Sequence, residues 1–488
     1  MLTSRIYQWA QAGPERTAVI YNDTPISYAS FSRAIEDVRV LLEEQGLPAG
    51  GVAIVLAKNL LQAWMLDLAL RALGLTSISV QSIAQAEELK VRNVACVIVI
   101  KRERDAHDLG AKSLAGIKVI VVSTVIRPEV DPDSLPELPD NPPAFGGHIV
   151  YTSGTTGSYK KLLMGGANDA QRNDWWARKL SLTSGTVFHI VGFGLWTAAG
   201  FGFPAAVWQA GGCVVMDQRK DPLKKLFRHR ITNAFLMPDM VAEAVEVHGS
   251  APRVDFELTT AGGFLPLAVA EKVIGRLTDK LKISYASTEC IAVLRAEFRA
   301  IDDLYWLTPY SERIVQVVDE NGNECPPDEE GDLRVLLRDI DCAAYLDDAE
   351  TSARFFRDGY FYPGDMAVKR ADGRFRILGR TADVLNVKGR KIAVAPLEDA
   401  IQRHLQVEAV CLFSGLSDEG KEELVVAIES DRDLPKAELD AISRLDALAR
   451  VVASFGGFRY SILKAFPRTQ TGMSKVRRAA LRKRLFKQ

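Results

Sequence analysis

One short stretch combines residues that could hold a phosphate group. YTSGTTGSYKK, residues 151–161, places two glycines beside several serine and threonine hydroxyls and ends in two lysines. Such turns let backbone N–H groups and hydroxyls converge on an anion, and a nearby ammonium adds positive charge. The Gly-Lys-Ser/Thr end of the common P-loop is absent, since Tyr159, Lys160 and Lys161 stand there. We predict a phosphate loop of another type, although a Ser/Thr/Gly turn without a ligand has the same composition.

More short motifs follow this loop along the chain. They are TTAGGFLP (259–266), YASTE (285–289), GDLRV (331–335), YPGD (362–365), GRTADVLNVKGRKI (379–392) and PRTQTGMSKVRR (467–478). In order and spacing, they and TSGTTGxxK resemble the motifs of the adenylate-forming superfamily, which contains acyl- and aryl-CoA synthetases, luciferases and nonribosomal-peptide adenylation domains. Each motif alone is weak evidence, but the resemblance spans nearly the whole chain.

The resemblance implies an ATP and Mg²⁺ site and a two-step ligase reaction. Thr288 would contact the α-phosphate, Glu289 would hold Mg²⁺, and Lys475 would stabilise negative charge during adenylation. Asp365 and Arg380 would hold the ribose. The full set of nucleotide and cofactor contacts that it implies is Thr152, Ser153, Gly154, Thr155, Thr156, Gly157, Lys160, Gly263, Phe264, Tyr285, Ala286, Asp365, Ile377, Arg380 and Gly389. The loop around Gly389 would face the pantetheine of coenzyme A or of a separate carrier protein.

A hydrophobic segment is expected to hold the acid. We assign the substrate pocket to Phe193, Gly194, Trp196 and Gly262, with Phe201 and Phe264 as further aromatic candidates, although at least half of the aromatics could be ordinary core. Residues 175–216 contain no acidic side chain to pair with an ammonium group, so an aryl or medium hydrophobic carboxylic acid is favoured over an amino acid. His189 receives no role.

Some positions depart from the family pattern. Tyr159 replaces a proline, Ala286 a glycine and Pro363 a threonine. The hinge position is Ala382, where Asp or Lys is usual, and the terminal motif reads GMSK instead of GK. These changes leave open a second interpretation, a degenerate homologue that binds nucleotide or acyl ligand without turnover.

Alternating helix and strand patterns predict the fold. We expect helices over 28–45 and 59–73 and strands over 52–56, 96–100, 118–122 and 148–151. This is typical of an α/β protein with mostly parallel sheets in a large, multi-subdomain N-terminal region, residues 1–381. A smaller α+β domain is expected over 382–488, with a helix at 397–404 and strands at 409–413 and 423–428. The resemblance implies that this domain is mobile.

Composition excludes some functions. The chain has 488 residues, with 61 Lys and Arg against 62 Asp and Glu, so no nucleic-acid partner is expected. The six cysteines are scattered and no signal peptide is evident, which favours a cytoplasmic protein. Residues 190–216 carry no charge and are long enough to cross a membrane. Pro204 and the glycines there favour a buried, pocket-forming segment instead.

Overall fold

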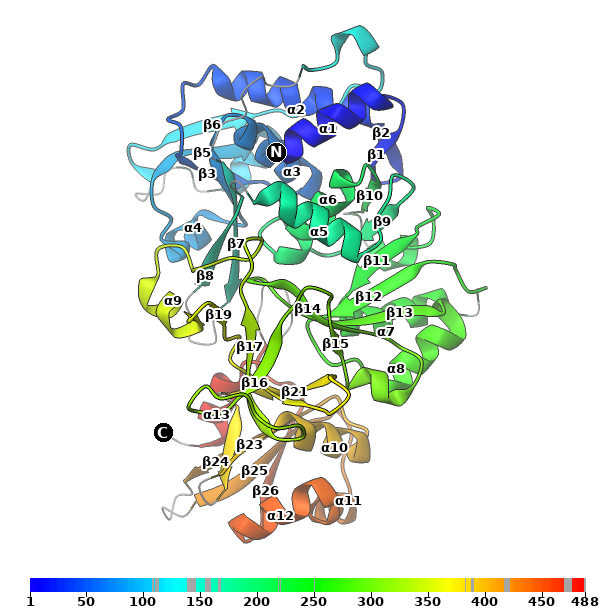
Figure 1. Cartoon of the computed structure of the whole chain (residues 1–488), viewed down its shortest axis with the longest axis vertical. Coiled ribbons are helices and arrows are strands. Elements are labelled where there is room, and N and C mark those ends of the chain that lie inside the picture. The colour runs from blue at the N-terminus through cyan, green and yellow to red at the C-terminus, as the bar shows by residue number, and fades with distance from the viewer. Residues whose placement is uncertain are drawn as a thin grey trace. The chain divides into compact units, whose positions relative to one another are not determined.

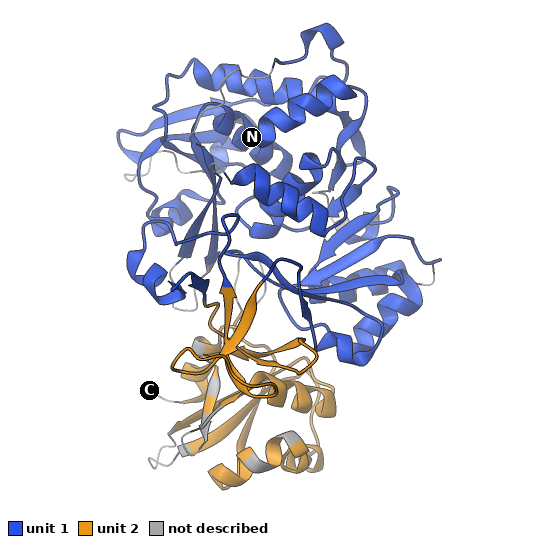
Figure 2. Cartoon of the chain, in the orientation of Figure 1, with its two compact units in different colours: residues 1–313, 336–361 blue, residues 314–335, 362–488 orange. Residues whose placement is uncertain are grey.

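The chain forms two compact units, coloured separately in Figure 2. Unit 1 contains residues 1–313 and 336–361, and unit 2 contains residues 314–335 and 362–488. The computed structural model describes residues 1–107, 109, 114–137, 146–153, 159–165, 168–217, 219, 221–249, 251–381, 383–387, 390–416, 422–468 and 476–486. The division predicted at Thr381 stays a prediction.

Unit 1 contains a six-stranded sheet in the order β6-β5-β3-β4-β7-β8. Its strands are β3 (Val52–Leu56), β4 (Thr76–Val80), β5 (Val94–Ile100), β6 (Lys118–Val122), β7 (Gly147–Ser153) and β8 (Tyr159–Gly165). All neighbours are parallel except β7 and β8, which are antiparallel. The strand predicted over 52–56 is found at those residues, and its five residues are all buried.

A nine-stranded sheet, in the order β15-β14-β13-β12-β11-β9-β10-β1-β2, forms the second layer of unit 1. Its strands are β1 (Thr17–Tyr21), β2 (Thr24–Ser27), β9 (Val187–Ile190), β10 (Cys213–Met216), β11 (Asn233–Leu236), β12 (Glu257–Ala261), β13 (Lys280–Ser287), β14 (Ile291–Glu297) and β15 (Thr308–Pro309). The central strands from β1 to β13 are parallel, and antiparallel strands close both edges. The predicted mostly parallel α/β fold is confirmed.

Helices cover these sheets, and several of them lie between the two (Figure 1). They are α1 (Leu2–Ala12), α2 (Tyr28–Glu43), α3 (Leu60–Ala72), α4 (Ile83–Leu89), α5 (Asp169–Lys179), α6 (Ala198–Gln209), α7 (Pro238–His248), α8 (Leu267–Lys272) and α9 (Ala349–Phe355). Side-chain caps fix some starts: Ser27 accepts from the Ser30 N–H and Asn59 from the Gln62 N–H. The two predicted helices therefore begin within a residue of their expected positions.

Aromatic side chains fill the core between the sheets. Trp64 of α3 meets Trp208 of α6 edge to face at 5.1 Å and stacks on Phe201 at 5.3 Å. Phe31 of α2 lies 5.0 Å from Trp208. Phe201 is 2% exposed, so it belongs to this core, as half of the pocket aromatics were expected to do.

Unit 2 is built from smaller sheets and helices. Its elements are β16 (Val315–Val318), β17 (Glu330–Leu336), β20 (Asp365–Lys369), β21 (Phe375–Arg380), β22 (Val384–Val387), β23 (Arg390–Ala393), α10 (Ala395–Leu405), β24 (Ala409–Leu416), β25 (Glu422–Glu429), α11 (Lys436–Ala441), α12 (Asp446–Phe455), β26 (Arg459–Leu463) and α13 (Arg478–Leu485). Strand β17 pairs with β16 and β20, and β20 pairs with β21. Helices α10 and α12 share a core with the sheet β24-β25-β26, in agreement with the α+β character predicted for the end of the chain.

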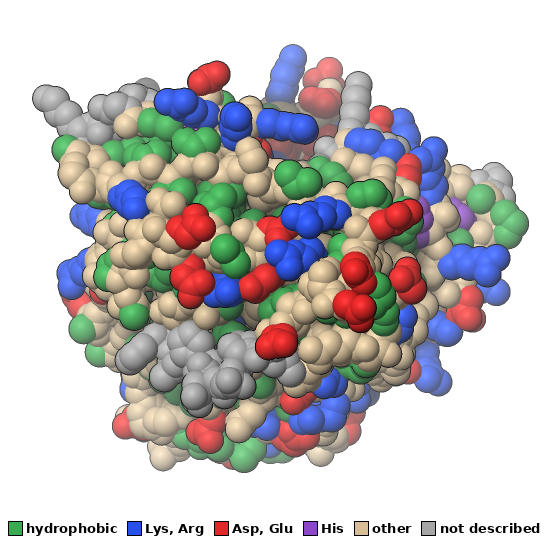
Figure 3. Space-filling model, turned by 90° about the horizontal axis from the view of Figure 1, so that it is seen from above, with side chains coloured by type: hydrophobic (Ala, Val, Ile, Leu, Met, Phe, Trp, Pro, Cys, Tyr) green, Lys and Arg blue, Asp and Glu red, His purple; other side chains and the backbone are tan. Residues whose placement is uncertain are grey.

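The uncharged run at residues 190–216 folds as the end of β9, a loop, helix α6 and strand β10. Within the described residues, no helix is long and apolar enough to span a membrane. On the face in Figure 3, basic and acidic side chains of the described residues are interspersed, and neither sign dominates. This distribution agrees with the near balance of charges in the sequence.

Candidate functional site

The predicted phosphate loop joins the two antiparallel strands β7 and β8. Thr152 pairs with Lys160 and Ser153 with Tyr159 across this hairpin. The predicted contacts Gly154, Thr155, Thr156 and Gly157 lie outside the described residues. The register nevertheless places the two ends of the loop, and Thr152 and Lys160 with them, on adjacent strands.

The Lys160 ammonium lies against two aromatic rings. Its Nζ atom is 3.4 Å from the centroid of the Phe355 ring and 4.9 Å from that of Tyr345. Both distances are within the range of a cation–π interaction. Lys160 is therefore held beside the hairpin by aromatic side chains from residues 338–355, which we call the tyrosine segment.

Thr288 and Glu289 lie in the tight turn between the antiparallel strands β13 and β14, where Ser287 pairs with Ile291. Glu289 is only 8% exposed. Its Oε1 accepts a hydrogen bond of 2.7 Å from the Tyr345 hydroxyl, and its backbone oxygen accepts one of 3.0 Å from the Cys342 N–H. The tyrosine segment thus fixes both the side chain and the backbone of the predicted magnesium ligand.

A buried ion pair anchors the tyrosine segment to the turn. Arg313 and Asp341 have fully buried side chains and form two contacts, at 2.5 and 2.8 Å. Arg313 also donates from Nε to the Ala292 carbonyl at 3.0 Å, and the Arg338 N–H donates to Asp341 at 2.9 Å. With these contacts, the pair connects the turn end of the β13–β14 hairpin to the start of the tyrosine segment.

Four predicted nucleotide contacts, Gly263, Phe264, Tyr285 and Ala286, and the pocket residue Gly262 meet where β12 ends beside β13 in the nine-stranded sheet. Ala261 at the end of β12 pairs in parallel with Ser284 of β13, so Gly262, Gly263 and Phe264 follow β12 beside Tyr285 and Ala286. Gly262 has φ of +90°, which a side chain would disfavour. Phe264 is 45% exposed, and its ring packs 5.2 Å from that of Tyr305. This edge offers small residues and an exposed aromatic face to a flat ring.

Three of the four predicted acid-binding residues, Phe193, Gly194 and Trp196, lie in the loop between β9 and α6, and the fourth, Gly262, follows β12. Phe193 packs 5.3 Å from Phe235. A β-carbon at Gly194 would lie 2.2 Å from ring atoms of Trp196, so the Trp196 indole covers this glycine closely. The Trp196 carbonyl accepts from the Tyr151 N–H at 3.1 Å, which connects the loop to β7.

A buried polar network strengthens this connection. His148 of β7 contacts the Leu195 carbonyl through Nε2 at 2.8 Å and the Ser77 hydroxyl through Nδ1 at 2.7 Å. Ser77 also donates to Asp67 at 2.6 Å, and Asp67 pairs with Arg71 at 2.9 Å. Strand β7 and the loop between β9 and α6 are therefore held together by one hydrogen-bond network.

His189, next to this loop, differs from His148. It is 1% exposed, and neither ring nitrogen has a hydrogen-bond partner within the described part of the chain. Burial lowers the pKa of His189 to about 4, which the Asp217 carboxylate opposes and His229 reinforces. The side chain is therefore neutral at pH 7.

In unit 2, the structure brings the two predicted ribose contacts together. Asp365 and Arg380 are paired across β20 and β21, with 3.1 Å between Oδ1 and Nε. Arg380 also donates to the Pro363 carbonyl at 2.9 Å. Ile377 pairs with Ala367 on the same two strands. Gly389, Lys475 and the hinge residue Ala382 lie outside the described residues.

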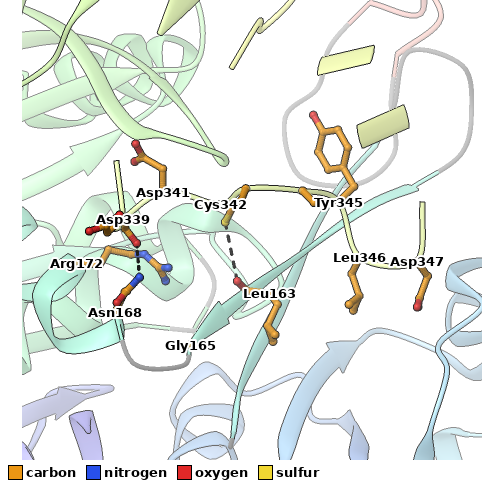
Figure 4. Close-up of a pocket in the computed structure, with 12 residues that line it drawn as sticks. Leu163, Gly165, Asn168, Arg172, Asp339, Asp341, Cys342, Tyr345, Leu346 and Asp347 are labelled. Atoms are coloured by element: carbon orange, nitrogen blue, oxygen red, sulfur yellow. Dashed lines mark hydrogen bonds between the residues drawn. The ribbon is translucent and has the colours of Figure 1, made fainter. Parts of the chain in front are cut away.

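A groove of about 320 Å³ lies beside the tyrosine segment and is partly lined by it (Figure 4). Leu163, Arg172, Asp339 and Leu346 are among its lining residues. Tyr345 also borders this groove, but its side chain projects away from Leu346 and Leu163 in Figure 4. None of the predicted site residues lines the groove.

Two residues of the site were not found from the sequence, Tyr345 and Phe355. Tyr345 is 56 positions from Glu289, and the quoted motifs contain neither aromatic residue. The contacts of Tyr345 and Phe355 with Glu289 and Lys160 arise from the tertiary fold. A single sequence offers no local pattern that indicates them.

Comparison with known proteins identifies the class of the chain. The AMP-binding enzyme family matches residues 6–336, and the chain belongs to this family. The resemblance to the adenylate-forming superfamily is thereby confirmed.

Individual relatives are more distant. The chain is 25% identical to pseudomonine synthase PmsE of Pseudomonas entomophila over 83% of this chain and 71% of that protein. It is 24% identical to 2-succinylbenzoate–CoA ligase of Bacillus licheniformis over 82% and 84% of the two chains. The structure of O-succinylbenzoate coenzyme A synthetase from Bacillus subtilis with ATP and magnesium has a TM-score of 0.81, 19% identity and coverage of 98% and 99%. This last likeness shows a shared fold.

Proposed function

We propose that the protein activates a carboxylic acid with ATP and transfers the acyl group to a thiol. The observation that carries the proposal is the convergence of Lys160 and Glu289 on Tyr345. A cation from the phosphate hairpin and a carboxylate from the neighbouring turn provide the two kinds of group that a polyphosphate and its metal ion need. Membership of the AMP-binding enzyme family supports the same chemistry.

The single carboxylate that Glu289 provides fits a magnesium ion that is bound mainly through ATP. Within the described residues, no group of three or more His, Cys, Asp or Glu side chains could hold a metal. Mg²⁺ often needs only one or two carboxylates beside phosphate oxygens and water. Glu289 supplies one carboxylate, and the ion would neutralise phosphate charge when bound.

In the proposed first step, a carboxylate oxygen of the acid attacks the α-phosphorus of ATP. The bond from this phosphorus to the bridging oxygen breaks, and pyrophosphate leaves with the electron pair. Thr288 would donate to an α-phosphate oxygen, and Ser153, Thr155, Thr156 and Lys160 would hold the leaving group. Asp365 and Arg380 would bind the ribose, and Lys475 would stabilise charge between the acyl and phosphate oxygens.

In the second step, the thiol loses its proton and its sulfur attacks the acyl carbonyl. The bond between the acyl carbon and the phosphate oxygen breaks, which gives a thioester and AMP. We propose coenzyme A or a carrier-bound phosphopantetheine as the thiol, reached by the loop at Gly389. The name of the Bacillus licheniformis relative, which includes CoA, supports the first choice.

We favour an aryl or medium hydrophobic acid. Phe193, which packs against Phe235, and Trp196, whose indole covers Gly194, would supply apolar groups to the proposed pocket. Residues 175–216 contain no carboxylate that could pair with an ammonium group. The cysteines support a cytoplasmic location, because all six are unbridged.

ATP–pyrophosphate exchange tests the proposal. We expect the purified protein to exchange label with one class in a panel of aryl, fatty and amino acids. Exchange with amino acids alone would overturn the proposed substrate class. A protein that binds ATP but exchanges with no acid would be the degenerate homologue.

A further inference from the structure

We propose that Tyr345 is a positioning residue that orients the Glu289 carboxylate for the magnesium ion of MgATP. The inference rests on the proposed function, because it concerns the same nucleotide site. None of the motifs quoted from the sequence contains Tyr345. Its role follows from what its hydroxyl, ring and backbone contact.

The Tyr345 hydroxyl bonds directly to the Glu289 carboxylate. A phenol has one proton to donate, and Tyr345 gives it to Oε1 of Glu289 over 2.7 Å. Tyr345 is 4% and Glu289 8% exposed, so water competes little for this bond and the carboxylate is held in one orientation. The bond leaves the lone pairs of Oε2 for a metal ion. Such partners of metal ligands commonly set ligand orientation and metal affinity.

The Tyr345 ring contacts the Lys160 ammonium. The Lys160 ammonium lies 4.9 Å from the Tyr345 centroid and 3.4 Å from that of Phe355. One side chain therefore contacts both the cation assigned to the phosphates and the carboxylate assigned to the metal. The Tyr345 ring and hydroxyl therefore link groups of opposite charge, the Lys160 ammonium and the Glu289 carboxylate.

Tyr345 is itself held firmly. The Phe355 and Phe356 rings meet it edge to face at 5.9 and 5.1 Å. Its N–H donates to the Ser352 hydroxyl at 2.9 Å, and the next residue, Leu346, donates to the Lys161 carbonyl at 2.8 Å. A side chain fixed by packing and backbone bonds can orient its partner, as a mobile one cannot.

The effect should appear in nucleotide binding, before any chemistry. Tyr345→Phe keeps the ring beside Lys160 and removes the hydroxyl that bonds to Glu289. We expect the magnesium-dependent gain in ATP affinity to fall by about 10–100-fold, the usual cost of losing a partner of a metal ligand. ATP affinity in EDTA should not change. Isothermal titration calorimetry with ATP, at a series of Mg²⁺ concentrations and in EDTA, measures both quantities.

Tyr7→Phe is the matched control. The Tyr7 hydroxyl donates to the Glu36 carboxylate at 3.0 Å, and Tyr7 is 2% exposed. The same kind of bond is therefore lost between helices α1 and α2, far along the chain from the magnesium turn. Its ATP affinity should match the wild type at every Mg²⁺ concentration.

A double variant separates positioning from a general loss of stability. In a Glu289→Gln background, Tyr345→Phe should cause no further loss of magnesium dependence, because its effect passes through the carboxylate. An equal further loss would overturn the inference, as would unchanged magnesium dependence in Tyr345→Phe alone. A wild-type protein that binds no ATP with or without Mg²⁺ would overturn the proposed function itself, and this inference with it.

Discussion

Two arginine–aspartate pairs in the molecule differ sharply in exposure. In unit 1, the side chains of Arg313 and Asp341 are both 0% exposed. In unit 2, the Arg380 side chain is 47% and that of Asp365 8% exposed. The buried pair is surrounded by its own hydrogen bonds, from Arg313 to Ala292 and from Arg338 to Asp341. The exposed pair keeps much of its guanidinium in solvent, where a ligand can reach it.

Residue type alone therefore does not distinguish an ion pair that stabilises the fold from one that binds a ligand. Removing one partner of a buried pair leaves a charge without water or a counterion, at a cost of about 3–5 kcal/mol. An exposed pair contributes about 0–1 kcal/mol, because water screens it. The buried pair should therefore govern stability, and the exposed pair should govern binding.

The largest expected effect is that of Arg313→Leu. Asp341 would stay buried without its cation, and the free energy of unfolding should fall by about 3–5 kcal/mol. Urea unfolding followed by circular dichroism measures this loss. The double variant Arg313→Leu/Asp341→Leu should recover most of it, since no unpaired charge remains. A single variant as stable as the wild type would show that the pair does not support the turn.

His189 is a buried titratable group that forms no ion pair with the described residues. Its pKa of about 4 in the folded chain lies below the usual 6.5, so acid favours the unfolded state, which binds the proton more readily. Stability is fully present above pH 6.5 and falls as the pH drops toward 4, by about 3 kcal/mol in total. Unfolding of His189→Leu between pH 7 and 4.5 should show a smaller loss than the wild type. Parallel pH curves would contradict the assigned environment.

Arg380→Gln tests the exposed pair. Its free energy of unfolding should change by less than about 1 kcal/mol, because the guanidinium is half exposed. ATP binding should weaken by about tenfold or more, the scale of one lost charged hydrogen bond of ~1.5–3 kcal/mol. Thermal unfolding and calorimetric ATP titration measure the two effects. A large loss of stability with normal ATP affinity would reverse the roles of the two pairs.

The smallest effect is expected at a pair outside both sites. Arg299 and Glu297 lie 3.0 Å apart with side chains 80% and 56% exposed. Arg299→Ala should change the free energy of unfolding by less than about 0.5 kcal/mol and leave ATP affinity unchanged. Urea unfolding at low and high salt checks this. A loss of unfolding free energy close to that of Arg313→Leu would show that side-chain exposure does not decide how much an ion pair stabilises the fold.

Local patterns predicted much of the fold. The strand at Val52–Leu56 and the helix expected over 59–73 depend on neighbouring residues, and both lie within a residue of their expected positions. The resemblance also named Asp365 and Arg380 as ribose contacts, and adjacent strands bring these two side chains together, while their role stays a prediction. The Arg313–Asp341 and Tyr345–Glu289 contacts were missed, because they join distant segments whose meeting depends on tertiary packing. The loop contacts at 154–157 and Lys475 stay predictions.

The route of the chain through its two units has a consequence for synthesis. Unit 1 is interrupted after Arg313 and resumes at Leu336, once residues 314–335 have been contributed to unit 2. A nascent chain that ends at Arg313 therefore lacks Asp341 and Tyr345. Domains tend to fold as the chain emerges from the ribosome. Arg313 would therefore lack Asp341, and Glu289 would lack Tyr345, until the later residues have been translated. The turn that carries Glu289 would be among the last parts of unit 1 to mature.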